Sequence, residues 1–190
     1  KDNIGVYLNN SNLKNSGTVS VEDGTAAQNI GIYAFAKDKS GTADSFTLEN
    51  TGAIEVNGLK NIGIYGKTDD GVPGNTGLIN LSSGRINVTA SDPLTAGNVP
   101  LGVYVKGENI NVSSTSSVTK VSENGIGVYL DGKSTLGKTG GVFNGDFTLK
   151  SAANSKPAIG AYLKGGAQAL TGNIKVVSTG TVLDSSGNPI

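Results

Sequence analysis

The sequence predicts an all-β protein: a single-chain, right-handed parallel β-helix (β-solenoid) of about six coils, with three short strands in each coil. Three observations predict this fold. A motif of two aliphatic residues around a glycine, followed by tyrosine, recurs through the chain; aliphatic and polar residues alternate with a strand period; and Gly, Asn, Ser and Thr punctuate the alternating segments. The motif occupies residues 4–7, 30–33, 62–65, 101–104, 126–129 and 159–162.

The tyrosines and the spacing of the motif define the repeat. All 6 tyrosines of the chain lie at the last position of a motif copy. The shortest repeat runs 25 residues, from Gly102 to Gly127, and the longest runs 39, from Gly63 to Gly102. A repeat of the shorter length is filled by three strands of about five residues and three turns. The longer repeats therefore carry insertions at the turns.

Each repeat contains three segments in which apolar residues alternate with polar ones, and each segment is an expected strand. The weakest is the segment around Leu13. The expected first strands are 4–8, 30–34, 62–66, 101–105, 126–130 and 159–163; the second strands lie around 13 and at 46–48, 78–81, 110–112, 142–143 and 174–177; the third strands are 18–21, 54–56, 86–88, 118–121, 147–149 and 182–183.

Strand alternation predicts which side chains face the core. Ile4, Val6 and Leu8 share one face of their strand, whereas Gly5 and Tyr7 share the other. Burial of each aliphatic side chain is worth roughly 1.5–3 kcal/mol, so we expect the aliphatic face inward and the glycines and tyrosines outward. Right-handed winding is expected from the twist of strands and the handedness of parallel crossovers.

The repeat runs from one end of the sequence to the other, so residues 1–190 are expected to form one continuous solenoid domain. The chain opens immediately before a motif copy, and its last four residues resemble the approach to another. We therefore expect it to be an internal segment of a longer protein.

The composition argues against several classes of function. The net charge is +0 and the chain has a single arginine, Arg85, so nucleic acid is not expected as a partner. The absence of cysteine removes disulfides and thiolate metal sites. No apolar run approaches 18 residues, so no membrane span is expected in this segment.

No catalytic residue, metal site or cofactor is expected. The chain has no histidine and no cysteine, which removes the common nucleophile–base pairs. Two pairs of neighbouring acids occur, at 22–23 and 69–70, but neighbouring strand residues point to opposite sides and neither pair recurs one repeat away. We therefore expect a protein that is not an enzyme.

The tyrosines are the one candidate for a binding site, and two interpretations are open. Outward rings at coil spacing form an aromatic strip that suits sugar faces or an apolar protein patch. Alternatively, the rings form a stacking ladder that shields the backbone, which is the interpretation we favour. The candidate residues are Tyr7, Tyr33, Tyr65, Tyr104, Tyr129 and Tyr162.

The repeats, most clearly residues 29–33 and 61–65 with Ser-Gly or Thr-Gly corners between them, resemble the passenger repeats of large type V autotransporters, in particular the long fusobacterial adhesins. The resemblance implies a non-catalytic stalk or adhesion segment at the bacterial cell surface, on the outer membrane. Its partners would be surface proteins or glycans of host cells or other bacteria. The alternative is the scaffold of a carbohydrate-active β-helix enzyme whose active coil lies elsewhere.

Overall fold

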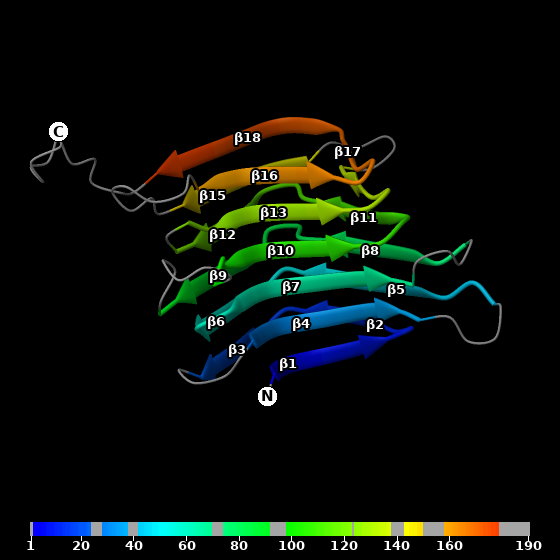
Figure 1. Cartoon of the computed structure of the whole chain (residues 1–190), viewed down its shortest axis with the longest axis horizontal. Helices are drawn as coiled ribbons and strands as arrows, with labels where there is room; N and C mark the ends of the chain where they lie inside the picture. The colour runs from blue at the N-terminus through cyan, green and yellow to red at the C-terminus, as the bar shows by residue number, and fades with distance from the viewer. Residues whose placement is uncertain are drawn as a thin grey trace, which may run out of the picture.

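The structure is a computed structural model that describes residues 2–23, 28–37, 42–69, 74–91, 98–122, 124–137, 143–149 and 158–178. Over these residues the chain is a parallel β-solenoid without helices. Its strands form three sheets, each with six strands, and successive strands of a sheet come from successive repeats (Figure 1). The predicted all-β solenoid with three strands in each repeat is confirmed.

The first sheet consists of the motif strands, paired in parallel with the repeats in register. Tyr7 lies beside Tyr33, and Tyr33 lies beside Tyr65. The same correspondence continues through the remaining three strands. The strands are β1 (Asp2–Asn9), β4 (Gln28–Ala36), β7 (Asn61–Thr68), β10 (Leu101–Lys106), β13 (Ile126–Asp131) and β16 (Ile159–Lys164).

The second sheet is the narrowest of the three, because its last two strands contain two residues each. Its inward side chains are large and apolar, with Phe46, Leu48 and Ile79 almost completely buried. The strands are β2 (Asn12–Asn15), β5 (Ser45–Asn50), β8 (Thr76–Asn80), β11 (Ile110–Ser113), β14 (Thr135–Leu136) and β17 (Gln168–Ala169).

The third sheet closes each coil and leads back to the next motif strand. Ile54, Ile86 and Phe147 occupy equivalent inward positions on three of its strands and are buried. The strands are β3 (Thr18–Asp23), β6 (Ala53–Gly58), β9 (Arg85–Ala90), β12 (Ser117–Val121), β15 (Phe143–Leu149) and β18 (Thr171–Ser178).

Two predicted strands of the last repeats were assigned to the wrong sheet. Residues 142–143 were expected in the second sheet, but Phe143 begins β15 of the third sheet. Residues 174–177 were likewise expected in the second sheet, but they lie within β18. The true second-sheet strands, β14 and β17, are too short to show alternation. The third-sheet strand predicted at 182–183 lies outside the described residues.

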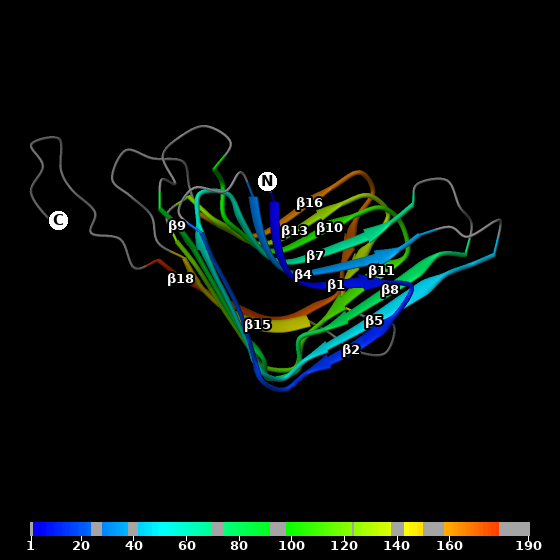
Figure 2. The same ribbon diagram turned by 90° about the horizontal axis from the view of Figure 1, so that it is seen from below.

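The expected outward orientation of the motif glycines is wrong. A Cβ added to Gly31 would lie 2.5 Å from Cγ2 of Ile54, a core residue of the third sheet. A Cβ on Gly63 would lie 2.5 Å from Cγ2 of Ile86 in the same way. The first-sheet strands bend (Figure 2), which breaks the regular alternation. The glycine column therefore allows the third sheet to approach the first sheet closely.

The apolar core runs along the solenoid and is best enclosed in the four inner coils. Ile32, Ile64, Val103 and Val128 form one fully buried column along the first sheet. The end coils are more exposed, since Ile4 of β1 is 41% exposed and no described residue of β16, β17 or β18 is buried. The interior is thus most protected away from the two ends of the described stack.

Asparagine side chains form two ladders between coils. In the first, Nδ2 of Asn29 donates to Oδ1 of Asn61 at 3.1 Å and to the carbonyl oxygen of Asn57 at 3.2 Å. Asn29 and Asn61 are almost completely buried. The ladder therefore satisfies amides that would otherwise be costly to bury, and it links the first sheet to the third.

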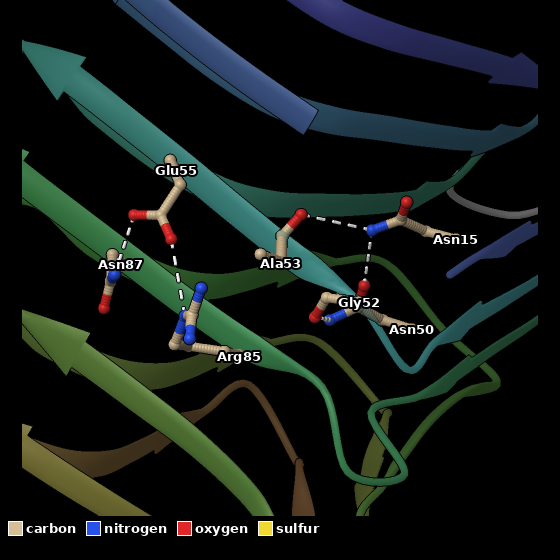
Figure 3. A network of polar contacts seen from close by, with 7 residues as sticks. All are labelled: Asn15, Asn50, Gly52, Ala53, Glu55, Arg85 and Asn87. Carbon is tan, nitrogen blue, oxygen red and sulfur yellow. Dashed lines mark hydrogen bonds and ion pairs between the residues drawn. The ribbon is translucent and has the colours of Figure 1, made fainter. Parts of the chain in front are cut away.

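The second asparagine ladder fills the corner between the second and third sheets. Nδ2 of Asn15 donates to Oδ1 of Asn50 at 2.8 Å and to the carbonyl oxygen of Ala53 at 3.2 Å (Figure 3). Nearby on the outer face, Glu55 accepts a hydrogen bond from Asn87 at 2.7 Å and pairs with Arg85 at 3.4 Å. Polar contacts thus join neighbouring coils both inside this corner and outside it.

Candidate functional site

The six tyrosines form a continuous column of rings on the outer side of the first sheet. The ring centroids of Tyr33 and Tyr65 are 4.8 Å apart with planes 6° apart, and those of Tyr65 and Tyr104 are 4.9 Å apart with planes 13° apart. Toward the ends the rings tilt: the planes of Tyr7 and Tyr33 differ by 55°, and those of Tyr129 and Tyr162 by 84°. The rings are therefore stacked face to face in the middle of the column and tilted or edge-on toward its ends.

Stacking decides which part of each ring a ligand can reach. One face of the Tyr65 ring is covered by Tyr33 and the other by Tyr104. A sugar that packs on an aromatic ring needs an open ring face, whereas this stack leaves mainly ring edges accessible. The two terminal rings are the most open, with Tyr7 52% and Tyr162 43% exposed. The arrangement therefore suits a stabilising ladder better than a sugar platform.

Three of the tyrosine hydroxyls resist ionisation. Partial burial raises the pKa of Tyr33 above its ordinary value, with smaller contributions from Tyr7 and Asp69. Burial also raises the pKa values of Tyr104 and Tyr129, and Asp131 adds to both shifts. A partly buried phenolate beside a carboxylate is unfavourable, so Tyr33, Tyr104 and Tyr129 favour their protonated, uncharged form.

A second outward column runs parallel to the tyrosines, two residues further along each strand. It contains Phe35, Lys67, Lys106 and Asp131, which lie side by side in the sheet register. The ammonium of Lys67 lies 4.8 Å from the centre of the Phe35 ring, within cation–π distance. This column combines one aromatic ring with charged groups of both signs, so it is not a single-sign patch.

A charged hollow of about 200 Å³ lies where this column meets the turn into the second sheet. Nζ of Lys133 lies 3.1 Å from Oε1 of Glu108, and Nζ of Lys164 lies 3.6 Å from Oδ2 of Asp131. These ion pairs are largely solvent-exposed, so each contributes little free energy. The hollow is lined by two lysines, Lys106 and Lys133, and by two acids, Glu108 and Asp131, so its balanced charges give no strong preference for an anion or a cation.

Several acidic side chains that converge on one point would indicate catalysis or metal binding. Among the described residues, no group of three or more Asp, Glu, His or Cys side chains is placed to hold a metal ion. Asp69 is described, whereas Asp70 lies outside the described residues. Glu22 lies on β3, where Nδ2 of Asn57 donates to its carboxylate at 3.4 Å.

The sequence interpretation missed the polar elements that join the coils. Asn29 and Asn61 lie immediately before the motif in successive repeats. This repeated position is the sequence feature from which the buried ladder could have been predicted. The sequence interpretation also missed a polar groove between the second and third sheets, lined in part by Asn144 and Asp146. The available signal there was the loss of glycine from the corner of the fourth repeat, at residues 113–117.

Comparison with known proteins adds no family to this picture. No family model, no curated protein and no solved structure matches the chain. In the part of the chain that the structure describes, no helix has the length and apolar character needed to cross a membrane. The candidate functions therefore rest on the repeat, the stacked columns and the surface chemistry.

Proposed function

We propose that this chain is a non-catalytic stalk and adhesion segment of a bacterial surface autotransporter. In this proposal it is exposed outside the cell on the outer membrane, winds as a right-handed helix of six coils, and presents loops and the tyrosine face toward proteins or glycans of other cells. Its rigid body would hold these loops away from the producing cell.

The observation that supports the proposal is the continuous stacking of three parallel sheets. The first sheet pairs continuously from β1 to β16, and the other two pair from β2 to β17 and from β3 to β18. Each coil contacts mainly its neighbours, so the fold grows along one axis and is suited to a spacer. The stacked tyrosines contribute to stiffness without requiring a ligand.

Exposure on the cell surface is the first part of the proposal to test. Antibodies raised against the purified chain should label intact cells that produce the parent protein, and brief protease treatment of those cells should remove the label. Labelling that appears only after the cells are permeabilised would contradict a surface location.

Attachment is tested separately with the purified chain as a competitor. The chain should reduce binding of producing cells to their target cells. Tyr65→Ser combined with Tyr104→Ser opens the ring stack, while the matched pair Tyr65→Phe and Tyr104→Phe retains the rings. If the serine variant competes as well as the unmodified chain, the tyrosine column is structural and attachment uses the loops. Failure of every form to compete would refute the adhesion role.

A further inference from the structure

The corner between the second and third sheets changes in character along the solenoid. In the first three coils it contains a glycine, and these corners stack without intervening space. A Cβ on Gly52 would overlap the carbonyl oxygen of Gly17, and one on Gly84 would overlap the side chain of Asn50. The corner of the fourth coil, residues 113–117, contains no glycine and is built from hydroxyl residues.

Beyond this change the corner opens into a groove of about 350 Å³. That volume lies at the lower end of the range for small-molecule sites. The groove runs across β12, β15 and β18, next to the corner that joins the second sheet to the third. Its lining includes Thr115, Ser116, Ser117, Asn144, Asp146 and Asn173.

A β-bulge in the groove fixes the orientation of one lining side chain. Between β15 and β18 the register shifts, so that Asn144 lies opposite two residues of β18, one of which is Asn173. The backbone N–H of Asn173 donates to Oδ1 of Asn144 at 2.7 Å. Since the Oδ1 atom of Asn144 already accepts this hydrogen bond, the side chain presents its Nδ2 group as a donor to the groove. The bulge holds the side chain in this orientation before a ligand binds.

The other lining groups complement this donor. Asp146 lies two residues further along β15 on the same outward face, and its carboxylate has no hydrogen bond or ion pair to a described residue. The hydroxyl of Ser116 is exposed on the opposite wall. The hydroxyl of Ser117 is already bonded to Ser114, at 2.7 Å, which keeps that wall in place.

The chemistry of the lining restricts the ligand class. The six named lining side chains are hydroxyls, amides and one carboxylate, none of them aromatic or aliphatic, so an apolar ligand gains little there. The carboxylate of Asp146 accepts hydrogen bonds from hydroxyl groups, and Lys175, opposite Asp146 in the strand register, offsets its charge, so the surface there suits an uncharged ligand. Asn144 and Asp146 project from one strand face about 7 Å apart at their backbones, close enough to contact neighbouring hydroxyls of one ring.

We propose that this groove binds an uncharged pyranose ring, with Asp146 accepting and Asn144 donating hydrogen bonds to adjacent sugar hydroxyls. The inference refines the proposed attachment function and rests on it for its biological meaning. It places sugar recognition at the corner between the second and third sheets, away from the tyrosine column. A single shallow site with few hydrogen bonds should bind with a dissociation constant in the millimolar range.

The test uses the full chain labelled with ¹⁵N and follows backbone amide chemical shifts. The probes are the methyl glycosides of glucose, galactose and mannose, with glucuronate as the anionic comparison and glycerol as a non-ring polyol. At least one methyl glycoside should shift the amides of Ser116, Asn144 and Asp146 in a saturable manner. Glucuronate should shift them less, and glycerol should produce no saturable change.

Two variants separate a site from general surface effects. Asp146→Asn should weaken glycoside binding about tenfold, because it removes a charged acceptor. The matched control Asp131→Asn makes the same change in the same coil but on the first sheet, and should bind like the unmodified chain. Absence of saturable shifts with all three glycosides, or equal affinity of Asp146→Asn, would overturn the proposal. Surface labelling of intact cells would be unaffected by that result, so the two proposals fail independently.

Discussion

The most informative single substitution is Gly63→Ala, because it adds one methyl group where the first and third sheets approach each other closely. The added Cβ would lie 2.5 Å from the carbonyl oxygen of Gly102, 2.5 Å from Cγ2 of Ile86 and 3.3 Å from Cγ2 of Val88. Real Cβ atoms do not approach other heavy atoms this closely. Ile86 is fully buried, and the Gly102 oxygen belongs to the paired backbone of β10, so neither can move freely.

The expected loss follows from two opposing terms. Overpacking a well-filled core typically costs about 1–3 kcal/mol. Replacing glycine with alanine also stiffens the unfolded chain, which stabilises the protein by about 0.4–1 kcal/mol. The net prediction for Gly63→Ala is a destabilisation of up to about 2.6 kcal/mol, with a central value of about 1.3 kcal/mol.

Gly17 provides a matched control in the same protein. A Cβ added to Gly17 meets nothing within 4 Å. Gly17→Ala therefore stiffens the unfolded chain without creating a clash in the folded one. It should leave stability unchanged or raise it by up to about 1 kcal/mol. The comparison of the two variants therefore isolates the packing contribution.

Urea unfolding followed by tyrosine fluorescence and circular dichroism measures both variants. The chain has 6 tyrosines and no tryptophan, so its fluorescence reports directly on the ring column. The midpoint should fall for Gly63→Ala at an unchanged slope. If Gly63→Ala and Gly17→Ala unfold at the same urea concentration, the glycine column does not face the third sheet and the packing argument is refuted.

Three further substitutions test other parts of the stack. Thr119→Val should raise the free energy of unfolding by about 1 kcal/mol, because the buried Thr119 hydroxyl has no hydrogen-bond partner among the described residues. Thr148→Val, on the outer face, should leave the free energy of unfolding almost unchanged in the same urea titration. Asn29→Ala should destabilise by about 1–3 kcal/mol by leaving buried ladder partners unsatisfied, and exposed Asn111→Ala should not. Because burial raises the folded pKa of Tyr104, the unfolded chain ionises first and stability falls as pH rises above about 10; thermal unfolding of Tyr104→Phe should show a smaller loss over this range.

The first sheet could be predicted from the sequence because the same motif recurs in each of its six strands. Aliphatic residues, glycine and tyrosine recur together, so each copy confirms the register of the others. The second sheet carries less information: Thr135 and Leu136 make up the whole of β14, too few residues to show a period. Phe143 was therefore assigned to the nearest apolar pair and placed in the wrong sheet.

Side-chain direction in the motif could not be obtained from alternation alone. The period-two rule holds for a straight strand, whereas the motif strands bend and turn Gly31 and its equivalents toward the third sheet. The tyrosine column was predictable because six identical rings at one repeat position favour mutual stacking. The groove at Asn144 and Asp146 was not, because it depends on a bulge between neighbouring coils.

The distance between the first and last coils tests the central claim most directly. Asn9 and Lys164 belong to the same outward column of the first sheet, five strand steps apart. The chain has no cysteine, so spin labels attached through Asn9→Cys and Lys164→Cys report only this pair. Five steps of about 4.8 Å predict a single narrow distribution near 24 Å between the backbones, broadened by the label linkers. A broad distribution, or one centred at a much longer distance, would show that the six motif strands do not stack in one sheet.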